Sequence, residues 1–131
     1  MKSGKQRRAE IMTRRRERAS SVMGLDVFKP LRRLPCGAVA ADQARLAHNN
    51  TCGALPAFYL DRCFECRDCG IEEVWTAKRQ KWWYEDVHGS IYSTAVRCRA
   101  CRRIAQSRVA QARLASAEGL RLKNELKNKI K

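Results

Sequence analysis

Large apolar side chains are concentrated in one stretch of this chain. Eight of its nine aromatic residues lie between Phe58 and Tyr92, whereas the first 20 residues and the last 30 are rich in Arg and Lys. Within the aromatic stretch, the short runs 57–60 and 72–75 combine apolar and β-prone residues. They predict two strands that pair as a hairpin and contribute to a small core.

Two helices are predicted to follow. The first spans 77–87, with Thr76 as its N-cap and Gly89 as the residue that ends it. The second spans 98–118, and Gly119 is expected to stop it. A hairpin followed by helices indicates a small α+β domain.

The N-terminal third shows weaker patterns. Residues 2–19 are mostly helix formers, but Ile11 and Met12 do not continue into an apolar stripe. We therefore expect a solvated basic tail, or a helix that forms only on an anionic partner. An Arg-rich transit peptide is a weaker interpretation, because the stretch also contains two glutamates. Residues 21–55 predict a linker or a segment that wraps the core, with a short helix at 40–47.

Charge changes this picture more than composition does. The chain carries 28 Lys and Arg against 13 Asp and Glu, a formal charge of +15 at pH 7. The excess lies in 1–20 and 97–131, while 21–96 is neutral. No stretch approaches the roughly 20 apolar residues of a membrane span, and no apolar h-region follows the basic start. These features argue against a large enzyme, a membrane protein and a secreted domain.

Seven cysteines make a metal ion the next candidate. An odd number without a signal peptide does not suit a disulfide framework. Two residues separate Cys66 from Cys69, and two separate Cys98 from Cys101. Paired turns of this kind form the tetrahedral Cys₄ site typical of one structural zinc ion. The 28 residues between the pairs exceed the usual gap, so we expect them to hold elements of their own.

Cys63 offers an alternative first pair, because two residues also separate it from Cys66. We prefer Cys66 and Cys69, since Gly70 follows directly and can adopt the positive φ that a knuckle needs after its second cysteine. Cys63 is then a half-buried bystander. A [4Fe–4S] cluster that uses Cys63 is a weaker alternative. The remaining cysteines are predicted to be free thiols in a reducing cytoplasm: Cys36 and Cys52.

A metal ion would explain how so short a core is stable. A core of roughly 60 residues is marginal on hydrophobic burial alone. We expect a treble-clef or zinc-ribbon-like knuckle hairpin plus helices, with basic, partly disordered extensions. The expected parts are a basic tail at 1–20, the linker or wrapping segment at 21–55, the zinc-binding domain at 56–118 and a second basic tail at 119–131.

Basic and aromatic residues near the ligands are candidates for nucleic-acid contacts. A Cys₄ zinc centre has a formal charge of −2, so the five flanking arginines can neutralise it and still leave a basic rim for phosphates. Most aromatic side chains are expected in the core. Trp82 and Trp83 point about 100° apart on a helix, and one of them is expected to remain exposed for base stacking. The predicted contacts are Arg14, Arg15, Arg16, Arg67, Arg97, Arg99, Arg102, Arg103 and Trp83.

These motifs resemble the zinc-ribbon, treble-clef-like domain family of small bacterial proteins. The resemblance rests on Phe64, on the two cysteine pairs and on the runs 72–76, 80–85 and 95–102, together with the N-terminal 2–10 and Asn49-Asn50. It implies zinc on Cys66, Cys69, Cys98 and Cys101. It implies little about biological role. The departures from the family pattern affect the surface and leave the ligands unchanged: Cys52, Cys63, Asp86 and His88.

Three classes of function follow from these features. The first is a nucleic-acid-binding module, with RNA or ribosomal particles favoured over DNA, because concentrated positive charge releases counterions on contacting phosphates. The second is an adaptor that binds an acidic protein, with zinc purely structural. A nuclease-like enzyme is the weakest, because four thiolates leave zinc no open position. His48 and His88 lack the histidine pattern of such nucleases and are expected to be exposed.

Overall fold

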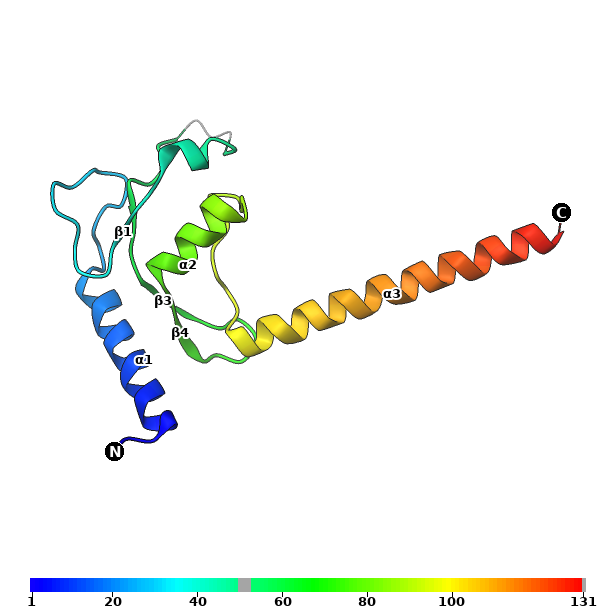
Figure 1. Cartoon of the computed structure of the whole chain (residues 1–131), viewed down its shortest axis with the longest axis horizontal. Coiled ribbons are helices and arrows are strands. Elements are labelled where there is room, and N and C mark those ends of the chain that lie inside the picture. Colours follow the sequence, from blue (N-terminus) through cyan, green and yellow to red (C-terminus); the bar gives the residue numbers. More distant parts are fainter. Residues whose placement is uncertain (50–52, 131) are drawn as a thin grey trace.

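The computed structural model describes residues 1–49 and 53–130 as a small α+β domain with one long projecting helix (Figure 1). Two short antiparallel hairpins, β1–β2 and β3–β4, lie among the helices. The elements in chain order are α1 (Gly4–Ser21), β1 (Val39–Ala40), the 3₁₀ turn η1 (Gln43–Leu46), β2 (Phe58–Tyr59), β3 (Arg62–Glu65), β4 (Glu72–Trp75), α2 (Ala77–Lys81), the π-helical turn η2 (Trp82–Asp86) and α3 (Arg99–Ile130).

The hairpin that carries the first cysteine pair is built from β3 and β4. Arg62 pairs with Trp75, and Glu65 pairs with Glu72. The predicted partner of β4, the run 57–60, is wrong: its residues Phe58 and Tyr59 form β2 and pair with β1 instead. The physical reason is loop closure, because β3 directly precedes the connecting turn and meets β4 at lower entropic cost.

Aromatic side chains form the core, as expected for most of them. Tyr59 stacks on Tyr84 with ring centroids 5.9 Å apart, and Trp75 packs against Tyr84 at 5.7 Å. Leu46 and Ala77 complete the buried cluster. Large rings supply the apolar area that a chain with few Leu, Ile and Val residues otherwise lacks.

The segment between α1 and β2 lies against this core. The backbone N–H of Ala57 donates to Val27 at 2.8 Å. Glu85 is fully buried, and its carboxylate accepts from Lys81 Nζ at 3.0 Å and from the backbone N–H of Asp42 at 3.2 Å. Lys81 Nζ also donates to the carbonyl of Ala40 at 2.8 Å. This ion pair therefore connects β1 and η1 to α2. The short helix expected at 40–47 is the 3₁₀ turn η1.

α1 is docked, which corrects the expectation of a solvated tail or a helix that forms only on a partner. It packs against β3 and β4, and a capping box between Ser3 and Gln6 begins it. The side that faces the domain carries Met12 and Arg15, which are half-buried, and Ala19, which is buried; the half-buried C-cap Val22 continues the same helical spacing. This side contains an arginine, and long basic side chains can pack their aliphatic stems while the charge stays in solvent. Apolar periodicity alone therefore missed it.

The predicted helix at 77–87 is present as α2 and η2. Thr76 caps it as expected, since its hydroxyl accepts from the backbone N–H of Arg79 at 3.4 Å. Gly89 was expected to end the helix, but the residue with positive φ there is His88, at 59°. Gly89 is small for another reason: a Cβ at this position would overlap the indole of Trp83.

α3 continues through its predicted stop. It runs unbroken past Gly119 to Ile130, so the expected helix end at Glu118 is wrong. A mid-helix glycine costs only about 1 kcal/mol relative to alanine, and ion pairs of Arg121 with Glu118 and with Glu125 span this region. None of the 32 described residues of α3 is buried. Among the described helices, none is long and apolar enough to span a bilayer.

Candidate metal centre

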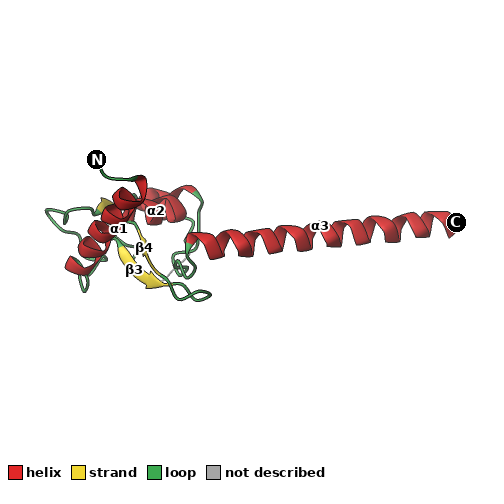
Figure 2. Ribbon diagram, turned by 90° about the horizontal axis from the view of Figure 1, so that it is seen from below, coloured by secondary structure: helices red, strands yellow, loops and turns green. Residues whose placement is uncertain are grey.

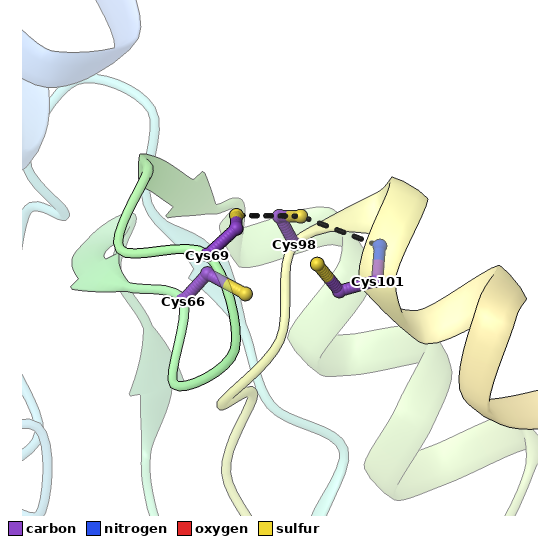
Figure 3. A group of neighbouring side chains, drawn as sticks. All are labelled: Cys66, Cys69, Cys98 and Cys101. Carbon is purple, nitrogen blue, oxygen red and sulfur yellow. Dashed lines mark hydrogen bonds between the residues drawn. The ribbon is translucent and has the colours of Figure 1, made fainter.

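The first cysteine pair lies in the turn between β3 and β4. The backbone N–H of Gly70 donates to the carbonyl of Cys66 at 2.9 Å, and that of Cys66 donates to Ile71 at 2.8 Å. Gly70 has a φ of 74°, the left-handed conformation expected for the residue after Cys69. The turn holds both sulfurs on one side of the hairpin tip (Figure 3).

The second pair lies at the start of α3. The carbonyl of Cys98 accepts from the backbone N–H of Arg102 at 2.9 Å. Its Sγ accepts from the backbone N–H of Cys101 at 3.4 Å. Cys98 therefore serves as a sulfur-containing N-cap. The positive end of the helix dipole lies beside both sulfurs, where it stabilises thiolates.

Two contacts bring the turns together. The backbone N–H of Arg67 donates to the carbonyl of Val96 at 2.9 Å. The side chain of Arg97 donates from Nε to Asp68 Oδ2 at 2.8 Å. Each contact joins the first knuckle to the segment that leads into the second. The protein itself thus positions the two pairs next to each other.

The four sulfur atoms have the spacing of a tetrahedral metal site. All lie within 4.8 Å of one another, and Cys69 Sγ is 3.7 Å from Cys98 Sγ (Figure 3). Four sulfurs on a tetrahedron with metal–sulfur bonds of about 2.3 Å would be roughly 3.8 Å apart. The residues therefore fit a bound metal ion. The structure brings together all four of the predicted ligands: Cys66, Cys69, Cys98 and Cys101.

The protein environment separates the acidities of the grouped thiols. The backbone N–H of Cys98 lowers the pKa of the Cys66 thiol to about 6. Hydrogen bonds that the Cys101 thiol donates to the Cys98 and Cys69 sulfurs raise the pKa of Cys101 well above its usual range. A raised pKa leaves protons on sulfurs such as Cys101 Sγ at neutral pH. A metal ion would replace those protons as the group that neutralises the cluster.

The other described cysteines lie outside this group. Cys63 is on β3 and exposed, not half-buried as expected. Its side chain alternates away from the hairpin face that Phe64 packs on the core, because consecutive strand residues point to opposite faces. Cys36 is also exposed. Cys52 lies outside the described residues.

Comparison with protein families agrees with this geometry. A family model described as "Probable treble clef domain" matches residues 60–109. Residues 60–109 are therefore similar to a treble-clef domain. The match contains β3, β4, α2, η2 and the first part of α3, hence all four grouped cysteines. It confirms the predicted family and the α+β fold class. No curated protein and no solved structure gave a significant match to the chain.

The predicted basic contacts fall into two groups. One surrounds the treble-clef metal centre: Arg67, Arg99 and Arg103 are exposed, Arg97 is paired with Asp68, and Arg102 is half-buried. The other is on α1, where Arg14 and Arg16 are exposed and Arg15 packs toward the domain. The structure therefore does not join the nine predicted residues into one surface.

The structure reverses the solvent exposure expected for Trp82 and Trp83. Trp83, the predicted stacking residue, is half-buried and donates from Nε1 to Ser93 Oγ at 2.8 Å. Trp82 is 56% exposed. The helical spacing correctly separated the two rings, but the close approach of Gly89 decided which ring turned inward.

A cavity of about 630 Å³ lies beside the metal centre, and sequence analysis did not identify it. Its walls come from β4, α2, η2, the segment 93–97 and the first turns of α3. The sequence could have indicated only the outer wall of this cavity, because Arg79 and Trp82 lie three residues apart on a predicted helix and therefore share one face. The opposite wall comes from residues far along the chain, which local periodicity could not place.

His48 and His88 are exposed, as expected. Their Nδ1 atoms lie 3.2 Å apart, and neither ring belongs to the cysteine group. The contact instead connects the segment after η1 to the turn after η2.

Proposed function

We propose that this protein is a zinc-stabilised nucleic-acid-binding protein. Zinc is the metal that best suits four thiolates in a tetrahedral arrangement. Its proposed role is structural, since four protein ligands leave no position for water or substrate, and we propose no catalysis at the metal. Thiolate ligands also require reducing conditions, so the cytoplasm is the proposed compartment.

The observation that carries the proposal is the placement of charge. The two basic ends form α1, which packs on the β3–β4 hairpin, and α3, which projects from the neutral central region (Figure 1). α3 projects as a rod of about 48 Å at 1.5 Å per residue, and nine of its 32 residues are Arg or Lys against two Glu. A long exposed basic helix fits a polyanion because each phosphate it contacts releases condensed counterions. RNA is the favoured polyanion.

The test is a binding curve for the full-length zinc protein on an RNA hairpin, a DNA duplex of matched length and polyglutamate, repeated from 50 to 200 mM salt. We expect nucleic-acid affinity to fall about 10³-fold over this range if about six phosphates are contacted. Replacing Lys123, Lys127 and Lys129 with Gln should reduce the salt slope. Equal or tighter binding to polyglutamate would contradict the proposal.

A protein-interaction adaptor is the second candidate. The segment after α1 exposes four large apolar side chains, which favours a protein partner: Met23, Leu25, Phe28 and Leu31. In that case an acidic protein would bind the basic helices, and zinc would only hold the fold. Replacing Phe28 and Leu31 with Ser would then weaken protein binding and leave nucleic-acid binding unchanged.

A further inference from the structure

We propose that the cavity beside the metal centre binds one unpaired nucleotide of a nucleic-acid strand, its base against tryptophan and its phosphates against arginine. This inference rests on the proposed function and gives it a specific site. The cavity volume of about 630 Å³ lies within the usual 300–1,000 Å³ of small-ligand sites.

All three tryptophans of the chain line this cavity: Trp75, Trp82 and Trp83. Trp75 forms its inner wall and is also part of the core, whereas Trp82 exposes 56% of its surface. An exposed indole beside a cavity offers a flat face to a planar base, and stacking is available to every base because each has a π-face. The indoles therefore indicate an aromatic ligand.

Three arginines line the same cavity: Arg79, Arg97 and Arg102. Of these, only Arg97 has a carboxylate partner among residues 1–49 and 53–130. The described lining residues include no Asp or Glu. No carboxylate of the described residues pairs with Arg79 or Arg102, and the arginines around the metal centre outnumber the two formal negative charges of a zinc–thiolate site, so the cavity is complementary to an anion. Aromatic and cationic walls together match a nucleotide better than an acidic peptide, because the acidic side chains of a peptide have no planar ring to stack on the indoles.

Hydrogen bonds and packing fix the walls of this cavity in the absence of a ligand. Trp83 is fixed by its hydrogen bond to Ser93 and by close packing on Gly89. Arg97 is fixed by Asp68 of the first knuckle. Arg102 lies in the first turn of α3, next to the second cysteine pair. The metal centre thus positions two of the three arginines, and such preorganisation lowers the entropic cost of binding.

The α3 wall of the cavity lies on a side of the helix that carries one further arginine. Arg102, Gln106 and Arg113 share one side of the helix by its 3.6-residue period. Glu118 and Glu125 lie more than about 100° around the helix from Arg113, where they pair with Arg121. A strand whose base occupies the cavity could therefore continue along α3 without meeting a carboxylate. A base within a duplex is stacked and paired, so the occupant must be unpaired.

The test uses tryptophan fluorescence, because every tryptophan of the chain lines the cavity. The full-length zinc protein is titrated with single-stranded A₆ as RNA, with the same hexamer as DNA, and with a blunt 12-base-pair duplex. We expect both single strands to quench the emission and the duplex to bind without quenching. The ratio of the RNA and DNA affinities shows which sugar the site favours.

Two variants separate the cavity from the basic surface. Trp82→Ala should weaken single-strand binding about 5- to 100-fold, the range for loss of one base–aromatic stack, and leave the duplex affinity unchanged. Arg79→Gln should weaken single-strand binding while quenching at saturation remains. Both side chains are exposed, and a thermal melt confirms that each variant is folded. The matched controls are Phe28→Ala and Arg121→Gln, which alter an exposed aromatic residue and an arginine outside the cavity.

The outcomes distinguish this inference from the proposed function. Single strands that bind without quenching, and with equal affinity for the parent and Trp82→Ala, would overturn the nucleotide site and leave nucleic-acid binding intact. Absence of binding to every strand and duplex would overturn both. Quenching by polyglutamate equal to that by A₆ would assign the cavity to an acidic peptide and overturn the nucleotide site.

Discussion

The two basic helices at the ends of this chain are held in different ways. α1 packs along the β3–β4 hairpin, with Ala19 5% exposed and Arg18 Nη2 3.5 Å from the buried carboxylate of Asp61. α3 is longer, yet none of its described residues is buried, and Figure 2 shows it leaving the domain as an unsupported rod. Similar composition therefore leads to one docked helix and one projecting helix.

Side-chain packing and the metal site therefore hold different helices. α1 depends on side-chain contacts with the hairpin. α3 joins the domain through its first turn, where Cys98 and Cys101 face the first knuckle. The contacts around the two cysteine pairs thus set the direction of the long basic helix, which a bound metal ion would fix, while packing on the hairpin sets the position of α1. Substitutions in the metal site and in the packed regions should therefore have separable effects.

Loss of the metal should have the largest effect. We expect Cys101→Ser, or treatment with a chelator, to abolish the cooperative thermal melt, because structural zinc supplies on the order of 10 kcal/mol of folding free energy in small domains. Circular dichroism during a melt, together with the zinc content by elemental analysis, measures this.

Cys63→Ser is the matched control, since Cys63 is exposed and lies outside the cysteine group. Its zinc content and melting temperature should equal those of the parent. A Cys101→Ser variant that melts cooperatively at the parent's temperature would show that the assigned ligand set is wrong.

Gly89→Ala should destabilise the packing around Trp83. The new methyl group would overlap the Trp83 indole and force it to move, at a cost of about 1–3 kcal/mol, as for other overpacked sites. Urea unfolding measures the free energy, and tryptophan emission reports the displaced ring. An unchanged emission spectrum with unchanged stability would contradict the close packing of Trp83 on this glycine.

Asp61→Ala should loosen α1 without affecting α3. Its carboxylate accepts from the backbone N–H of Ala77 at 2.8 Å and faces Arg18, so removing it leaves a buried donor unsatisfied. We expect a loss of about 1–3 kcal/mol in unfolding free energy. Amide hydrogen exchange should accelerate in α1 and remain at the parent rate in α3. Equal acceleration in both helices would argue against their independence.

Gly119→Ala should have the smallest effect, of opposite sign. Nothing lies within 4 Å of the position a Cβ would take, and alanine favours a helix over glycine by about 1 kcal/mol. Helical content by circular dichroism should rise at elevated temperature, while zinc content stays the same. A decrease in helicity would indicate that α3 bends or ends at this glycine.

The spacing of residues that are close together in the sequence correctly predicted the metal-binding turns and one helix cap. The two cysteine pairs and Gly70 identified the residues that the structure brings together, because a knuckle is a local turn with a fixed requirement at each position. Thr76 was identified as an N-cap for the same reason. The predicted partner of β4 was wrong, because the run 57–60 pairs with β1, a strand that no local pattern identified, and β3 takes its place in the hairpin.

The sequence by itself determined the metal-binding pairs, the segregation of charge to the two ends and the aromatic origin of the core, since each depends on residue type and local spacing. Tertiary structure alone decided that α1 docks, that Trp83 turns inward while Trp82 stays exposed, and that arginines from three segments meet around one cavity. Those outcomes depend on contacts between residues distant in the chain, whose energies no local pattern contains.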